Sequence, residues 1–95
     1  MSAYLEIILK IRPENRSAAA AVYTKYKEPF LTRIKGAEEK HLLVREADAQ
    51  VLHRFEKSEH AQAYLKSSLF TEDVAKALKP FLESEPDIRI YEVVG

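Results

Sequence analysis

The sequence of 95 residues contains no cysteine, no tryptophan and only two glycines. The absence of cysteine excludes a disulfide framework, thiolate zinc sites and a cysteine nucleophile. The glycines, Gly36 and Gly95, stand far apart, so the chain has no glycine-rich loop of the kind that cradles phosphates. It has no Ser-His-Asp elbow either. These absences remove several common classes of enzyme.

The sequence also lacks an excess of charge of either sign. Its 15 lysine and arginine residues balance 15 aspartate and glutamate residues. Nucleic acids and anionic lipids both favour a basic stripe on the protein that binds them. We therefore expect neither a nucleic acid nor a membrane as a partner.

Long apolar runs are absent as well. The first apolar stretch, residues 4–11, is interrupted by Glu6 and Lys10, and no basic segment precedes it. It fits neither a secretory signal nor a membrane span, so the cytoplasm is the expected location. The length of the chain and the lack of a linker predict a single domain over residues 1–95.

Two kinds of periodicity define the first predicted elements. Residues 4–11 carry apolar side chains at every second position, which predicts a half-buried strand that ends at Pro13. From about Glu14 the period becomes helical. The face of this helix that is predicted to turn inward carries Ala19, Val22, Tyr23, Tyr26 and Phe30. Pro29 removes a backbone donor, so we expect the helix to kink or end there and to resume briefly before a stop at Gly36.

Residues 40–56 alternate apolar and charged side chains on both sides of a small polar segment, which predicts a β-hairpin. With Asp48 and Ala49 as the central turn residues, Val44 would face His53 across the hairpin. Alternation along the second strand places His53 on the same face as its apolar neighbours Val51 and Phe55.

A second helical region follows, with Ser58 as its predicted N-cap. Thr71 and the two acids after it resemble a fresh helix start, so this helix is predicted to be split. Residues 84–87 form a turn, and residues 88–94 form a last strand. The order β-α-β-β-α-β predicts an α+β, ferredoxin-like fold, in which a four-stranded antiparallel sheet carries its helices on one face.

The other face of the predicted sheet mixes apolar and charged side chains. The apolar members are Ile8, Leu43, Leu52, Tyr91 and Val93. A small domain has a thin core, and such a face is costly to leave in water, so we expect it to pack against a second copy of the chain in a homodimer.

The chain resembles the dimeric α+β-barrel superfamily, and within it the antibiotic biosynthesis monooxygenase-like proteins. The resemblance is carried by IKGAEEKHLLVR (34–45), QVLHRFEKSEHAQAYLKSSLF (50–70) and PDIRIYEV (86–93). It implies a barrel made from the sheets of two subunits, with a ligand pocket between each sheet and its helices. It also implies oxidation of electron-rich aromatic compounds by molecular oxygen, without a cofactor. Haem-degrading members depend on a tryptophan, which this chain lacks.

His53 is the candidate catalytic residue. A partly buried imidazole near phenols can act as a general base or a hydrogen-bond donor, whereas a structural histidine would only satisfy a neighbouring hydroxyl or backbone group. The side chains predicted to form a pocket around it are Tyr23, Tyr26, Tyr64, Phe55 and Phe70. Each of these is accounted for equally well as a core residue.

The three histidines do not show the spacing of a metal site, and none is expected. His41 is predicted to lie at the dimer interface, and His60 is predicted to be solvated in the first turn of a helix.

Two functional interpretations remain open. One is a small-molecule enzyme of the monooxygenase-like kind, and the other is a non-catalytic dimeric module that binds a small hydrophobic ligand or only assembles. RNA binding ranks last, because the sheet offers few exposed aromatic residues and the chain has no basic surface.

Overall fold

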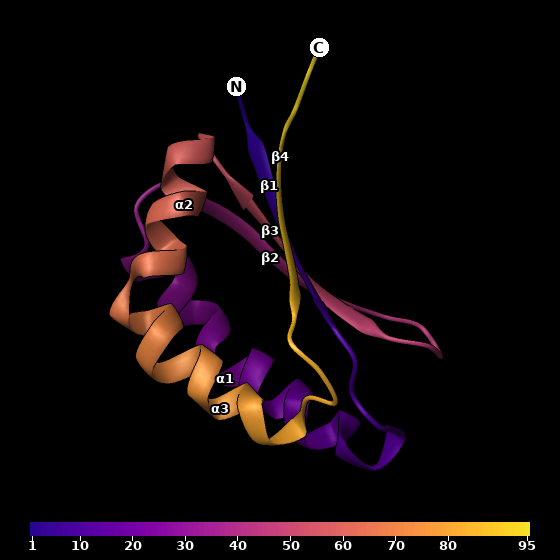
Figure 1. Ribbon diagram of the computed structural model, residues 1–95. Coiled ribbons are helices and arrows are strands. Elements are labelled where there is room, and N and C mark those ends of the chain that lie inside the picture. Colours follow the sequence, from indigo (N-terminus) through magenta and orange to yellow (C-terminus); the bar gives the residue numbers. More distant parts are fainter.

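The computed structural model describes all residues, 1–95. Four antiparallel strands form one sheet in the order β2-β3-β1-β4, and Figure 1 shows the helices on one side of it. The strands are β1 (Ala3–Leu9), β2 (Ala37–Val44), β3 (Ala49–Phe55) and β4 (Asp87–Glu92). The helices are α1 (Arg16–Arg33), α2 (Ser58–Lys66) and α3 (Ala75–Leu78), and a π-helical turn, Leu69–Val74, leads into α3. The predicted ferredoxin-like α+β fold is confirmed.

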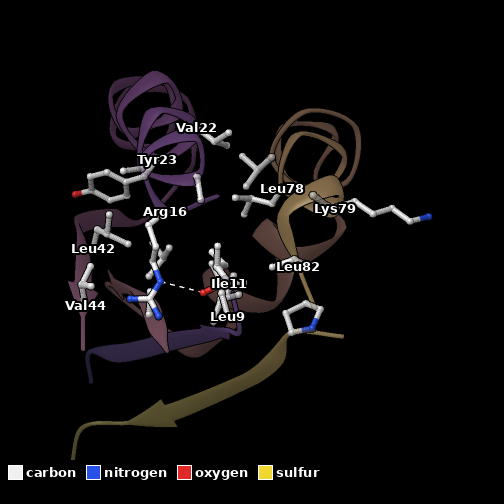
Figure 2. Close-up of a pocket in the computed structure, with 18 of the residues that line it drawn as sticks. Leu9, Ile11, Arg16, Val22, Tyr23, Leu42, Val44, Leu78, Lys79 and Leu82 are labelled. Atoms are coloured by element: carbon white, nitrogen blue, oxygen red, sulfur yellow. Dashed lines mark hydrogen bonds between the residues drawn. The ribbon is translucent and has the colours of Figure 1, made fainter. Parts of the chain in front are cut away.

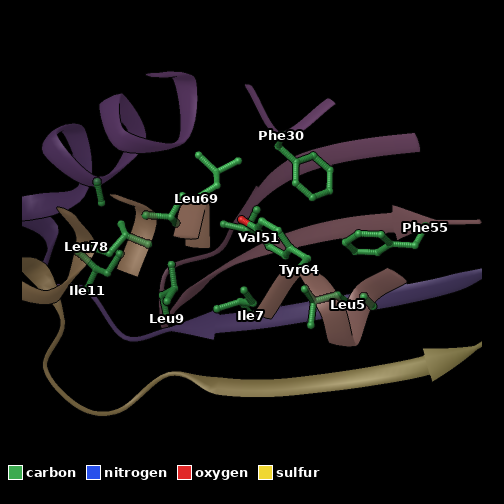
Figure 3. Packing of buried hydrophobic residues seen from close by; sticks show 13 residues of the cluster. Leu5, Ile7, Leu9, Ile11, Phe30, Val51, Phe55, Tyr64, Leu69 and Leu78 are labelled. Carbon is green, nitrogen blue, oxygen red and sulfur yellow. The ribbon is translucent and has the colours of Figure 1, made fainter. Parts of the chain in front are cut away.

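The core lies between the sheet and the helices (Figure 3). Strand β1 is central, and its side chains at Leu5, Ile7 and Leu9 are all buried, as the alternation predicted. Aromatic rings of three elements meet above β1 and β3. Phe30 of α1 packs edge-on against Phe55 and Tyr64, with ring centroids 5.4 and 5.0 Å away.

The register of the hairpin differs from the prediction. Val44 pairs with Ala49, so residues 45–48 form a four-residue loop and Lys40, not Val44, faces His53. Arg45 and Asp48 close the loop. The Arg45 backbone N–H donates to the Asp48 carbonyl, and the Arg45 guanidinium donates two hydrogen bonds to the Asp48 carboxylate, at 2.7 and 2.8 Å. The observed loop is therefore two residues longer than the predicted two-residue turn.

Helix α1 continues past Pro29 to Arg33 without ending there. A proline this close to the C-terminal end removes only one backbone donor, and the helix still closes with the Ile34 N–H donating to Phe30. Gly36 then adopts a φ of +79°, which favours glycine. A Cβ at this position would lie 2.0 Å from Nδ1 of His60, so glycine is required for space as well.

The second helical region is split, but not at the predicted residue. Thr71 does not cap a new start, because its hydroxyl donates back to the Ser67 carbonyl. Ser67 is the capping residue, with its Oγ accepting the Phe70 N–H at 3.3 Å. Ser58 is the first residue of α2 rather than its N-cap, and its hydroxyl donates to the Glu92 carboxylate.

The second face of the sheet is not covered by any helix (Figure 1). Leu43 and Tyr91, two of the side chains predicted to lie there, are 44% and 48% exposed. The dimer that would cover them stays a prediction.

None of the helices has both the length and the apolar content that spanning a bilayer requires.

Candidate functional site

A cavity of about 770 Å³ lies between the sheet and helices α1 and α3 (Figure 2). Seventeen of its 26 lining residues are hydrophobic. Its wall runs from fully buried side chains at the deep end, Lys40 and His53, to Val44 and Ile88, which are 62% and 40% exposed. The cavity is therefore an apolar pocket that opens near the β2-β3 loop and the start of β4. Its volume is in the range of small-molecule sites.

Small side chains make room for this cavity. The cavity is lined by Ala19 and Ala20 from α1, by Ala49 from β3 and by Ala75 from α3. The longer side chains of Leu9, Leu42 and Leu78 close the sides (Figure 2). The alanine run near the start of α1 therefore leaves a space beside the core that larger residues would have filled.

His53 lies at the deep end, on β3, and is 1% exposed. Its Nδ1 is 3.1 Å from the Leu5 carbonyl oxygen, which can only accept, so Nδ1 carries the proton and Nε2 is left as an acceptor. The imidazole packs against the rings of Phe30, Phe55 and Tyr64. Burial, together with the nearby charge of Lys40, lowers the pKa of His53 to about 3. The imidazole is therefore neutral and a weak base.

Lys40 faces His53 from β2 and is only 2% exposed. Its Nζ lies 5.3 Å from the centre of the Phe30 ring and 5.8 Å from that of Tyr23. Lys40 takes part in none of the ion pairs of the chain. Burial lowers its pKa to about 8. A buried lysine without a carboxylate partner is rare, because the desolvation of the ammonium is not repaid.

The sequence reasoning missed Lys40. The available signal was its position, because Lys40 has the same parity as Leu42 and Val44 on β2, which face the helices. Because the predicted pairing was shifted by four residues, Val44 took the place opposite His53, and the lysine was left outside the predicted site.

The predicted pocket residues divide into two groups. Tyr23 and Phe70 line the cavity, and the Tyr23 hydroxyl donates to the Lys40 carbonyl at 2.7 Å. Tyr26, Phe55 and Tyr64 lie outside its wall. Phe55 and Tyr64 are instead buried in the core around His53, and Tyr26 is half-buried on α1.

Arg16 is a second residue that the sequence reasoning missed. Its guanidinium donates to three carbonyl oxygens, those of Ile11 at 3.0 Å, Arg45 at 2.8 Å and Glu46 at 2.9 Å. Figure 2 shows the first of these bonds at the wall of the cavity. Arg16 therefore ties α1 to the end of β1 and to the hairpin loop, and its donors are committed to the backbone.

The remaining histidines lie away from the cavity. His41 is exposed on β2, 3.3 Å from the Glu39 carboxylate. His60 is not solvated as predicted, because it is half-buried with its ring against Gly36 and its Nδ1 enclosed without a partner. No three His, Cys, Asp or Glu side chains converge in a way that could hold a metal ion.

No protein-family model matches the sequence, and no curated protein matches it significantly. Solved structures of similar fold do exist. A protein from Caulobacter crescentus CB15 that is provisionally named an antibiotic biosynthesis monooxygenase superposes with a TM-score of 0.84 at 14% identity, over 99% of this chain and 91% of its own. A conserved protein from Methanosarcina mazei Go1 gives a TM-score of 0.82 at 16% identity, over 96% of this chain and 91% of its own.

A third similar structure is a dimeric protein of unknown function and ferredoxin-like fold from Bacteroides fragilis NCTC 9343, with a TM-score of 0.77 at 14% identity, over 97% of this chain and 96% of its own. At such low identities the likeness concerns the backbone and not the chemistry. The predicted resemblance is confirmed at that level: this chain has the ferredoxin-like fold of the antibiotic biosynthesis monooxygenase-like proteins.

Proposed function

We propose that the chain is a small-molecule enzyme of the antibiotic biosynthesis monooxygenase kind, which oxidises an electron-rich phenolic compound with molecular oxygen. The observation that carries this proposal is the apolar cavity of about 770 Å³ with two polar side chains, Lys40 and His53, at its deep end. Apolar walls with a few convergent polar groups are typical of sites for aromatic ligands. The fold shared with proteins provisionally named for this activity supports the same class.

The reaction needs no electron carrier, because the phenol supplies all four electrons. The phenolic O–H bond breaks, the ring carbon para to the oxygen forms a bond to O₂, and the distal oxygen of the resulting peroxide takes up the released proton to give a hydroperoxide at that carbon. Loss of water, which takes the remaining hydrogen of that carbon, leaves a quinone. One oxygen atom of O₂ becomes the new carbonyl and the other becomes water, so that C₆H₆O and O₂ give C₆H₄O₂ and H₂O in the simplest case.

The part of His53 in this reaction is to orient the substrate. Its Nε2 is an acceptor, so it can receive the hydrogen bond of a phenolic hydroxyl and hold it at the deep end of the cavity. The low pKa of His53, which burial lowers to about 3, makes it a poor final acceptor for the proton. The apolar wall excludes water from the ring carbon that reacts.

The test is oxygen uptake by the purified protein with a panel of hydroxynaphthalenes and anthrones. The expected product is a quinone that contains one labelled oxygen atom when the gas is ¹⁸O₂. His53→Ala should lower kcat by about 100-fold while the fold is kept, on the scale of a lost positioning contact. Tyr26→Phe, outside the cavity wall, should leave kcat unchanged. Quinone without label, or full activity of His53→Ala, would contradict the proposal.

We further propose that the chain works as a homodimer, in the cytoplasm. The dimeric protein from B. fragilis and the uncovered side chains on the second sheet face support this assembly. Native mass spectrometry should give twice the chain mass of 10.9 kDa. Leu43→Asp should give single chains if that face is the interface, whereas a charge at exposed Leu31 on α1 should not. A wild-type protein that is monomeric at micromolar concentration would exclude the barrel.

The second candidate function is binding without catalysis. The observation that favours it is the neutral, weakly basic state of His53, because a residue that only completes an apolar pocket needs no catalytic pKa. Under this interpretation the aromatic compounds bind, but no oxygen is consumed with any of them.

A further inference from the structure

The deep end of the cavity contains a cation without a counter-ion. Lys40 is 2% exposed, and no carboxylate lies within salt-bridge distance of it. The faces of Phe30 and Tyr23, at 5.3 and 5.8 Å from Nζ, compensate the charge only in part. Nζ donates no hydrogen bond within the chain and is not among the side-chain atoms that are sealed from solvent. Its donors are therefore available to the cavity.

The other charged or titratable groups of the wall do not compete for the same ligand. They are Arg16, Tyr23, His53, Lys79, Glu83 and Glu85. His53 is neutral and offers only an acceptor, and the guanidinium of Arg16 is committed to three backbone carbonyls. The Tyr23 hydroxyl donates to the Lys40 carbonyl, and the last three groups are exposed at the mouth. Lys40 is thus the one cation at the deep end that is free to bind an anion.

We propose that Lys40 binds the charged oxygen of an aromatic monoanion, a phenolate or a carboxylate, whose rings occupy the apolar part of the cavity. A single ammonium matches a single negative charge, so dianions such as phosphate monoesters would leave one charge buried and unpaired. The apolar wall formed by Leu42, Val51 and Leu78 then covers the rings. For a phenolate this rests on the proposed function, because it names Lys40 as the group that favours ionisation of the substrate.

The neighbour of Lys40 adds a second element of specificity. Lys40 and His53 are directly opposite each other on β2 and β3, and such pairs have Cβ atoms about 5 Å apart. A ligand with a hydroxyl beside its charged oxygen can give that hydrogen to Nε2 of His53 while the oxygen pairs with Nζ of Lys40. Aromatic compounds with a hydroxyl adjacent to the anionic group should therefore bind better than those without it.

The test is calorimetric titration at pH 7 with 2-naphthoate and with its neutral isostere naphthalene-2-carboxamide. The wild-type protein should bind the anion tenfold to a hundredfold more tightly, the range expected for a hydrogen bond to a charged group. In Lys40→Met this preference should disappear, while the affinity for the amide stays within about threefold, which shows that the cavity has kept its shape. Lys79→Met removes a lysine of the exposed mouth and should leave the preference intact.

A preference for 2-naphthoate that survives in Lys40→Met would overturn the proposal, and so would equal binding of both probes, or of neither, by the wild-type protein.

A second titration, with 2-naphthol, distinguishes the two kinds of anion. If Lys40 stabilises a phenolate, bound 2-naphthol ionises at lower pH in the wild-type protein than in Lys40→Met. The titration with 2-naphthoate involves no reaction with oxygen. Its result is therefore independent of the proposed function: the preference for the anion can be absent although quinone forms, or present although no quinone forms.

Discussion

Replacement of Lys40 by methionine should stabilise the folded protein. Methionine fills a similar volume and carries no charge to desolvate, whereas burial lowers the pKa of Lys40 from 10.5 to about 8. Each pKa unit corresponds to about 1.4 kcal/mol, so the charged lysine reduces the free energy of unfolding by about 3 kcal/mol. Lys40→Met should therefore be more stable than the wild-type protein by roughly this amount at pH 7.

The pH dependence gives the sharper test. Between pH 8 and 10.5 the unfolded chain keeps the proton of Lys40 while the folded chain has lost it, so wild-type stability should rise with pH by about 1.4 kcal/mol per unit relative to Lys40→Met. Above that range the two proteins should be equally stable. Urea unfolding followed by circular dichroism, with every variant at the same protein concentration, measures both effects. Lys35→Met, at an exposed residue, should change neither. A difference between wild type and Lys40→Met that does not vary with pH, or a less stable variant at pH 7, would refute this reasoning.

Four other substitutions have defined outcomes in the same unfolding assay. Because burial lowers the pKa of His53 to about 3, the folded wild-type protein should lose about 1.4 kcal/mol per unit as the pH falls from 6.5 towards 3, and His53→Phe should remove this part of the slope. The Tyr64 hydroxyl is enclosed without a partner, so Tyr64→Phe should raise the free energy of unfolding by about 1 kcal/mol. A less stable Tyr64→Phe would contradict the absence of a hydrogen-bond partner. Gly36→Ala should lower stability by at least about 1 kcal/mol through its positive φ alone. When the His60 ring is also removed, Gly36→Ala should lower stability by less, because the contact between the new Cβ and Nδ1 of His60 is then absent. An equal loss of stability with and without the His60 ring would contradict this close contact.

The fold could be predicted because its signals are local. Alternation along residues 4–11 follows from the burial of one face of a strand, and the structure buries Leu5, Ile7 and Leu9 accordingly. The order of the elements then leaves few topologies open. Loop geometry is different, because it depends on particular side-chain contacts. The ion pair of Arg45 with Asp48 lies within the hairpin loop, and nothing in the alternation encodes it.

The candidate site was predictable only in part for the same reason. The alternation of β3 correctly places His53 on the face towards the helices, but its partner across the hairpin depended on the register. The cavity itself arises where alanines of α1, β3 and α3 meet, which is a property of how the layers pack and not of any one segment. The commitment of Arg16 to three carbonyls likewise joins residues up to 30 positions apart in the sequence.

The π-helical turn at Leu69–Val74 bears on how this chain should be compared with others. Such turns contain one residue more than the regular helix they interrupt. One residue corresponds to about 100° of rotation around an α-helix. An alignment with a relative whose helix is regular therefore needs a single-residue gap within this turn. Without that gap, Phe70 on the cavity wall would be matched to a residue on a different side of the helix, and every position from there to the end of α3 would be compared with the wrong partner.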